Sequence, residues 1–185
     1  MQHSILLSGK KFQITIKRLC HQLIENHHQF ADSVIIGIQP RGIYLGRRIV
    51  KELQNILPDK QIPYGELDIT FYRDDFRMKG SVPHLASSTH IDFIVENKNV
   101  ILVDDVLWTG RTIRSSLDAL QAFGRPKKVE LLVLVDRRFA RHLPIEPNYV
   151  GLAIDSINSQ KVVVNWDEVD QIDQIELLNK DTIES

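Results

Sequence analysis

Two adjacent acidic residues end an apolar run in the stretch "ILVDDVLWTGRT". Asp104 and Asp105 follow three aliphatic residues, and a Thr-Gly-Arg-Thr turn at 109–112 comes just after them. A helical pattern begins directly behind this turn, and the unpaired N–H groups at the start of a helix form a cradle for phosphate. Two carboxylates close to such a cradle can accept hydrogen bonds from neighbouring hydroxyl groups. These residue types together predict a site for a phosphorylated ribose.

A second polar stretch, "IQPRG", follows another short apolar run. Its Arg41 carries a forked guanidinium that suits the oxygens of a phosphate group. Considered alone, Arg41 is better interpreted as a surface arginine at the start of a helix. The pattern at 101–112 favours a phosphate-binding role instead, in which Arg41 and backbone N–H groups bind an anionic leaving group.

The elements that would position these residues alternate between helices and strands. Apolar periodicity predicts helices at about 10–28, 42–57 and 112–123. Short apolar or alternating runs predict strands at 33–39, 64–73, 99–105, 128–137, 149–154 and 161–166. This alternation implies a mostly parallel sheet, and ligands bind at the carboxyl ends of its strands. We expect the acidic tail at 167–185 to be only partly packed.

One long stretch, 74–90, loses all periodicity and contains Gly80, Pro83 and four Ser or Thr residues. A structureless segment of this length inside a compact domain is usually functional or disordered. We therefore expect a flexible loop within a single domain that covers 1–185. No internal repeat or break in composition divides the chain.

The composition limits the classes of function. The net charge of −1 and pI of about 6.7 give no overall basic field that would indicate a nucleic-acid partner. A single cysteine, Cys20, excludes disulfide frameworks and cysteine-based zinc sites and favours a reducing compartment. The apolar run near the N-terminus is too short for a signal peptide, so we expect a cytoplasmic protein. The spacing of the seven histidines matches no metal cluster, and we expect these residues at the surface.

The stretch at 101–112 resembles the signature of type I phosphoribosyltransferases, enzymes that bind phosphoribosyl pyrophosphate (PRPP). The rest of the chain narrows the match, because several further stretches are similar to the bifunctional family of pyrimidine-operon regulators and uracil phosphoribosyltransferases. Apart from a shortened middle loop, this resemblance covers nearly the whole chain. The similar stretches include "GIQPRGIYLGRRI", "GELDITFYRDD", "VDDVLWTGRTIR", "LDALQAFGRP", "LPIEPNYVG" and "DEVDQID".

The resemblance implies an α/β fold of the type I phosphoribosyltransferase class, with a flexible hood loop at 74–90 and a small base-binding hood. It implies an enzyme that joins uracil to PRPP and gives UMP and pyrophosphate. The partners implied are Mg²⁺ bound with PRPP, without a metal site made by the protein alone, and further copies of the chain in a homodimer or larger homo-oligomer.

The same resemblance gives roles to particular residues. The catalytic residues would be Asp104, Asp105 and Arg41. PRPP would be bound by Pro40, Arg41, Gly42, Arg73, Val106, Leu107, Trp108, Thr109, Gly110, Arg111 and Thr112. The base would lie against Asp136, Arg137 and Val162.

The family also has a cis peptide bond before the arginine of its pyrophosphate loop. In this chain the corresponding bond is Pro40–Arg41, a cis non-proline linkage that costs about 3–4 kcal/mol. The proline at position 40 offers a second possibility, since Gln39–Pro40 can be cis at much lower cost. The sequence leaves both possibilities open.

Two alternative functions belong to the same resemblance. One is an RNA-binding, UMP-responsive attenuation regulator in which catalysis is vestigial, and the other is a purine phosphoribosyltransferase. The residues that would contact an mRNA leader are Arg18, His21 and Arg141.

The chain departs from the family pattern where RNA would bind. It has Arg138-Phe139-Ala140-Arg141 where relatives have Gly-His-Arg, and Glu146 and Leu152 replace basic residues. We therefore expect RNA attenuation to be weakened, retargeted or lost, unless other cations such as Lys161 and Arg141 substitute for the missing ones.

Overall fold

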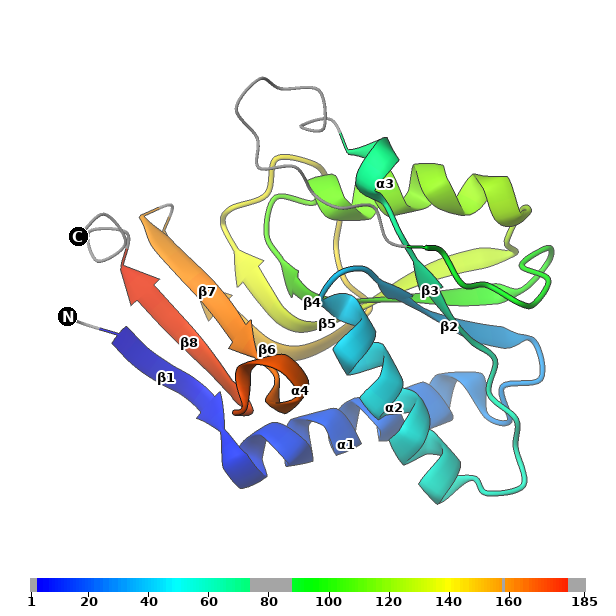
Figure 1. The fold of residues 1–185 in the computed structure, drawn as a ribbon, viewed down its shortest axis with the longest axis horizontal. Helices are drawn as coiled ribbons and strands as arrows, with labels where there is room; N and C mark the ends of the chain where they lie inside the picture. Colours follow the sequence, from blue (N-terminus) through cyan, green and yellow to red (C-terminus); the bar gives the residue numbers. More distant parts are fainter. Residues whose placement is uncertain (1–2, 74–87, 158, 180–185) are drawn as a thin grey trace.

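The computed structural model describes residues 3–73, 88–157 and 159–179, and its centre is a five-stranded parallel sheet. Its strand order is β3-β2-β4-β5-β6, and every neighbouring pair is parallel. Helices cover both of its faces, as expected for parallel strands joined by crossovers (Figure 1). The strands are β2 (Ser33–Ile38), β3 (Tyr64–Leu67), β4 (Asn99–Leu107), β5 (Lys128–Arg138) and β6 (Tyr149–Asp155).

Two apolar cores lie on the two faces of this sheet. Helices α1 (Gly9–His27) and α2 (Gly42–Ile56) pack on one face and bury Phe12, Leu19 and Leu45. Helix α3 (Arg111–Leu120) packs on the other face and continues into the 3-10 turn η2 (Gln121–Phe123). The mostly parallel sheet with flanking helices that the sequence predicted is confirmed.

A second, antiparallel sheet lies beside the first and has the order β1-β8-β7. It consists of β1 (His3–Ser8), β7 (Gln160–Asn165) and β8 (Gln174–Asn179), and the short helix α4 (Asp167–Asp170) connects β7 to β8. The prediction of a partly packed tail is confirmed for 167–179, although strand β8 itself was not predicted: residues 167–172 are exposed, whereas β8 pairs with strands on both sides and its Ile175 is fully buried. The sequence analysis also missed β1.

The predicted strand at 64–73 is too long. Strand β3 ends at Leu67, and the 3-10 turn η1 (Thr70–Tyr72) follows it. The carboxylate of Asp68 accepts hydrogen bonds from the backbone N–H and the hydroxyl of Thr70, at 2.8 and 2.6 Å. This local turn competes with strand pairing and ends β3, and Phe71 is left 71% exposed.

The side chain of His27 is only 5% exposed, so the prediction that the histidines are surface residues is wrong for this one. Its Nδ1 lies 2.8 Å from the hydroxyl of Ser33, and its Nε2 lies 2.8 Å from a carboxylate oxygen of Glu130. Both partners are buried too, and Tyr149 also donates to Glu130 at 2.8 Å. A buried imidazole is tolerated here because both of its ring nitrogens have partners.

Most of the predicted hood loop, residues 74–87, lies outside the described residues. The chain after it returns against β3, where Glu66 and His90 exchange two backbone hydrogen bonds of 2.8 Å each. The side-chain amide of Gln39 donates to the backbone oxygen of Ser88 at 2.9 Å. Within the described part of the chain, no helix is long and apolar enough to span a membrane.

Candidate active site

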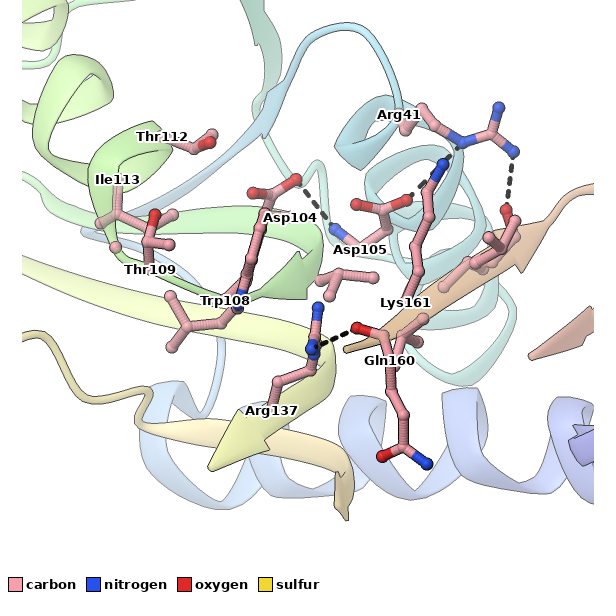
Figure 2. Close-up of a pocket in the computed structure, with 16 residues that line it drawn as sticks. Arg41, Asp104, Asp105, Trp108, Thr109, Thr112, Ile113, Arg137, Gln160 and Lys161 are labelled. Carbon is pink, nitrogen blue, oxygen red and sulfur yellow. Dashed lines mark hydrogen bonds and ion pairs between the residues drawn. The ribbon is translucent and has the colours of Figure 1, made fainter. Parts of the chain in front are cut away.

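A cavity of about 460 Å³ opens at the carboxyl ends of β4 and β5. The start of α3 closes one side of it, and β7 of the second sheet closes the other (Figure 2). This is the edge at which ligands bind in parallel α/β sheets. Of the residues predicted from the sequence, the following line the cavity: Arg41, Asp104, Asp105, Val106, Leu107, Trp108, Thr109, Gly110, Thr112, Arg137 and Val162.

Two carboxylates lie at the floor of this cavity. Asp104 and Asp105 are in β4, and Oδ1 of Asp104 accepts the backbone N–H of Asp105 at 2.9 Å. Burial raises the pKa of Asp104 well above its usual value, and the neighbouring charge of Asp105 adds to the rise. Burial also raises the pKa of Asp105, while the positive charge of Arg41 opposes that rise. Both carboxylates can accept hydrogen bonds. Because their pKa values are raised, the pair retains a proton more readily than an exposed carboxylate does.

The turn at 109–112, which the sequence predicts to be a phosphate cradle, lies at the start of α3. Gly110 precedes the helix with a φ of +89°, a conformation that glycine adopts without strain. The hydroxyl of Thr109 accepts the N–H of Arg111 at 3.4 Å, and Thr109 and Thr112 lie across the cavity from Arg41 (Figure 2). The helix start and the threonine hydroxyls together offer several donors to one anion.

Arg141 supports this turn from behind. Its Nη1 donates to the backbone oxygens of Trp108 and Leu107 at 2.5 and 3.2 Å, and its Nε donates to that of Ile145 at 2.9 Å. Its Nη2 forms an ion pair with the carboxylate of Asp136. The guanidinium predicted to contact RNA is thus directed inward, and the predicted base-binding residue Asp136 pairs with Arg141 outside the cavity lining.

Arg41 lies just before α2 and extends into the cavity mouth. Gly42 follows it where the chain passes β4 closely, because a Cβ atom at Gly42 would lie 2.5 Å from the backbone oxygen of Val103. The Gln39–Pro40 bond is cis, which answers the question that the sequence left open. Pro40 and Gly42 therefore determine the backbone path of the loop, whereas Arg41 supplies its positive charge.

The wall opposite β4 combines a cation with apolar surface. The guanidinium of Arg137 lies 4.9 Å from the ring centre of Trp108, and its Nε donates to the hydroxyl of Ser156 at 2.8 Å. Its Nη2 donates to the backbone oxygen of Gln160 at 2.8 Å. Burial lowers the pKa of Arg137. Trp108 and the valines of β7 supply the apolar part of this lining.

Sequence reasoning missed several residues of this wall. Ile113, Gln160, Val163 and Val164 line the cavity, as does Lys161, which was assigned only as a spare cation for RNA. The apolar run "KVVVNW" predicted a strand but gave no sign that it lies beside β4 and β5. Such proximity depends on the second sheet, which the sequence analysis did not predict.

The remaining predicted residues lie around or away from the cavity. Arg73 does not line the cavity, and its positive charge partly opposes the rise in the pKa of Asp104 that burial causes. Arg111 begins α3 but does not line the cavity. On α1, His21 is exposed, and Arg18 donates to the backbone oxygens of Val150 and Gly151 at 3.2 and 2.5 Å.

Comparison with known proteins identifies a family. Residues 2–169 match the phosphoribosyl transferase domain. The chain is 46% identical over 180 residues to the bifunctional protein PyrR of Actinobacillus succinogenes, covering 95% of this chain and 98% of that protein. It is 40% identical over 175 residues to the bifunctional protein PyrR of Bacillus subtilis, covering 94% and 96%.

Solved structures with low sequence identity share the fold. A hypoxanthine phosphoribosyltransferase from Staphylococcus aureus aligns with a TM-score of 0.70 at 23% identity, over 97% of this chain and 94% of that chain. A Trypanosoma cruzi hypoxanthine phosphoribosyltransferase aligns with a TM-score of 0.72 at 16% identity, over 97% and 93%. At these identities the likeness concerns the fold alone.

Proposed function

Because the chain belongs to the phosphoribosyltransferase family, we propose that it joins uracil to PRPP and releases UMP and pyrophosphate. One observation carries this proposal. The cavity brings together a helix-start cradle at 109–112, the carboxylates of Asp104 and Asp105, and the guanidinium of Arg41. A 5′-phosphate, a ribose and a pyrophosphate require these three kinds of partner. The similarity to bifunctional PyrR proteins favours the pyrimidine base.

The reaction makes the sugar carbon positively charged as pyrophosphate leaves. The turn at 109–112 would hold the 5′-phosphate, which fixes the ribose over the end of β4. Asp104 and Asp105 would then accept hydrogen bonds from the ribose hydroxyls and stabilise the developing charge. Arg41 would bind the leaving group at the cavity mouth, and its positive charge would favour departure.

Uracil would lie between Trp108 and β7. Arg137 and the backbone groups of β7 offer donors and acceptors to its ring edge. With the base bound, the wall formed by Trp108 and β7 would exclude water from one face of the reacting sugar. We assign Arg137 and Val162 to base binding, and Asp136 to the support of Arg141.

The carboxylates present fit a cation that arrives together with PRPP. Asp104 and Asp105 are adjacent, and the described part of the chain contains no group of three or more side chains able to hold a metal ion. Mg²⁺ would be held mainly by pyrophosphate and ribose oxygens, with water completing its octahedral shell, and would neutralise charge on the leaving group. Arg41 would share that task from the protein side.

The decisive experiment measures PRPP-dependent nucleotide formation with a panel of bases. Purified protein with PRPP and Mg²⁺ is expected to turn over uracil and to leave hypoxanthine and guanine unused. Turnover of a purine would replace the proposal by the purine alternative. Absence of turnover with every base, from folded protein that still binds UMP, would favour a regulator with vestigial catalysis.

A second candidate function is UMP-responsive binding of an mRNA leader, and the name "bifunctional" given to the relatives favours it. Arg18 and Arg141 were candidates for RNA contacts, and their bonds to backbone oxygens of this chain weaken the case, although Arg18 is exposed. Binding of a pyrimidine-operon leader with and without UMP tests this second role directly.

A further inference from the structure

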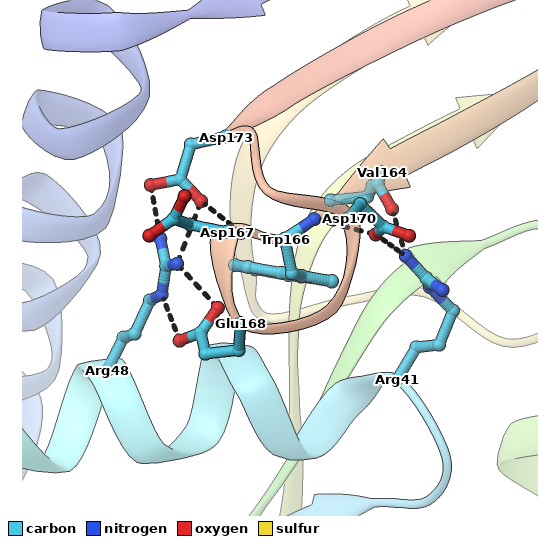
Figure 3. Close-up of polar contacts among 8 residues, drawn as sticks. All are labelled: Arg41, Arg48, Val164, Trp166, Asp167, Glu168, Asp170 and Asp173. Carbon is cyan, nitrogen blue, oxygen red and sulfur yellow. Dashed lines mark hydrogen bonds and ion pairs between the residues drawn. The ribbon is translucent and has the colours of Figure 1, made fainter.

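Arg41 is held from outside the cavity by Asp170, a residue of the short helix α4. Nη2 of Arg41 donates to Oδ2 of Asp170 at 2.5 Å and to the backbone oxygen of Val164 at 2.6 Å (Figure 3). Asp170 does not line the cavity, whereas Arg41 and Val164 do. Both N–H groups of Nη2 are therefore bound by the protein itself.

The rest of the guanidinium remains available to a ligand. Nε lies 3.7 Å from Oδ2 of Asp105, which is beyond hydrogen-bonding distance, and Nη1 has no hydrogen-bond partner among the described residues. Because the guanidinium is planar, fixing one edge also fixes the direction of its other donors. Arg41 thus presents Nη1 and Nε to an anion that enters the cavity mouth.

The segment that carries Asp170 is itself tied to α2 by a second arginine. Arg48 donates to both carboxylate oxygens of Glu168, at 2.9 and 2.7 Å, and to both oxygens of Asp173, at 2.8 Å each (Figure 3). Oδ2 of Asp170 also accepts the backbone N–H of Trp166 at 2.9 Å. Asp170 therefore meets Arg41 from a segment that is fixed at two points.

We propose that Asp170 is a positioning residue for phosphoribosyl transfer, which orients Arg41 toward the leaving pyrophosphate. This inference rests on the function proposed above. Without the negative charge of Asp170, Arg41 would be held less firmly and would turn toward the carboxylate of Asp105, which lies 3.7 Å away. That movement would remove a pyrophosphate ligand and also occupy a carboxylate needed by the ribose.

A carboxylate bound to Arg41 could instead compete with an incoming anion for the same guanidinium, which would weaken pyrophosphate binding. The geometry favours positioning over competition. Asp170 approaches from outside the cavity and uses only the Nη2 edge of Arg41. The two effects have opposite signs in a binding experiment, because removing a competitor would strengthen pyrophosphate binding.

The test compares Asp170→Asn with the control Asp173→Asn. Each variant loses an ion pair to an arginine, either Arg41 just before α2 or Arg48 within it, and keeps an oxygen for a backbone N–H, from Trp166 or from Asp167. Two quantities are measured in each protein: steady-state KM and kcat with PRPP and uracil, and calorimetric Kd for inorganic pyrophosphate with Mg²⁺. Thermal unfolding is recorded alongside.

We expect Asp170→Asn to raise both the KM for PRPP and the Kd for pyrophosphate by about five- to tenfold, the effect of one charge-assisted contact. The KM for uracil should stay within about twofold, since Asp170 is remote from the base wall. Asp173→Asn should lower Tm and leave these constants within about twofold. An equal rise in both variants would mean that the segment is merely loosened, and this would overturn the proposal.

The outcomes separate this inference from the proposed function. If the unchanged protein makes UMP but Asp170→Asn binds pyrophosphate equally well or more tightly, the positioning role fails and the function stands. If the protein makes no UMP but Asp170→Asn weakens pyrophosphate binding, the function fails and the positioning role stands. An unchanged protein that neither makes UMP nor binds pyrophosphate overturns both.

Discussion

Oδ1 of Asp104 accepts the backbone N–H of Asp105 at 2.9 Å, so two acidic side chains lie next to each other at the largely buried end of β4. Like charges in such a place repel each other and lose hydration, which destabilises the empty protein. The arrangement becomes favourable when the sugar above it acquires positive charge. The same two carboxylates therefore lower the stability of the free protein and stabilise the charge that develops in the proposed reaction.

The first prediction concerns turnover. Asp105→Asn keeps the shape of the side chain but removes its negative charge, which lies 3.7 Å from Nε of Arg41. We expect kcat for UMP formation to fall by about 10²–10³-fold, because charge stabilisation in the transition state is lost. Tm measured on the same sample verifies that the protein is folded. A folded variant with near-normal activity would remove Asp105 from the catalytic site.

The second prediction concerns pH and stability. The pKa of Asp104 is raised in the folded protein by burial and by the charge of Asp105. The folded state therefore binds more protons than the unfolded state between the ordinary and the raised pKa, and stability falls as the pH rises through that range. Asp104→Asn removes this dependence, so we expect its Tm to exceed that of the unchanged protein at pH 8.

The advantage of Asp104→Asn should shrink as the pH falls toward 4, where the carboxylate is protonated in the folded protein and about half protonated in the unfolded chain. Each kcal/mol corresponds to about 2–4 °C in a domain of this size. Thermal unfolding of both proteins at pH 4, 6 and 8 measures the effect. A variant that is less stable than the unchanged protein at pH 8 would contradict it.

The main sheet was readable from the sequence because its strands are buried on both faces. β2 is apolar and fully buried along its length, and the runs "ILVDD" and "LLVLVDR" end in polar groups at the ligand edge. The phosphate turn was readable because Thr109, Gly110 and Thr112 precede a strong helical pattern. Local patterns of this kind need no knowledge of distant parts of the chain.

The missed features depend on contacts between distant segments. β1 is an edge strand and β8 the central strand of the second sheet; their pairing joins the two ends of the described chain, and neither has a strong pattern alone. The contact between Arg41 and Asp170 spans 129 positions, and that between Arg141 and Trp108 spans 33. A charged residue with such a partner looks the same in the sequence as an ordinary surface residue.

The third prediction concerns Arg141. Arg141→Ala removes the donors to the backbone oxygens of Leu107 and Trp108 and leaves Asp136 without its cation. Because Asp136 is buried, we expect a loss of about 2–4 kcal/mol in the free energy of unfolding. The phosphate turn should also loosen, so the KM for PRPP should rise more than the KM for uracil.

The control for Arg141 is Arg138, the last residue of β5. Arg138 pairs with Asp155 at 2.7 Å, and both side chains are more than half exposed. Arg138→Ala should therefore change stability by only about 0–1 kcal/mol. Denaturant unfolding of the two variants measures the difference. Equal losses in both would mean that Arg141 is not a support of the phosphate turn.

The fourth prediction concerns RNA. Tight binding of a leader hairpin needs several cations that reach its phosphates. The guanidinium of Arg18 is bonded to backbone oxygens of β6, and that of Arg141 to those behind the phosphate turn. With a net charge of −1, the chain has no general attraction for RNA that would compensate. We therefore expect weak leader binding that UMP does not strengthen.

Gel-shift titration of a pyrimidine-operon leader at two salt concentrations tests this expectation, with a scrambled RNA of equal length as the control. Each phosphate contact contributes about 0.7–0.9 to the slope of log affinity against log salt, so few contacts mean a shallow slope. Tight binding, strengthened by UMP and steeply dependent on salt, would contradict the prediction. In that case Arg18→Ala and Arg141→Ala would show whether these two residues exchange their bonds to backbone oxygens for bonds to RNA phosphates. Each substitution would then flatten the slope of log affinity against log salt by about one contact.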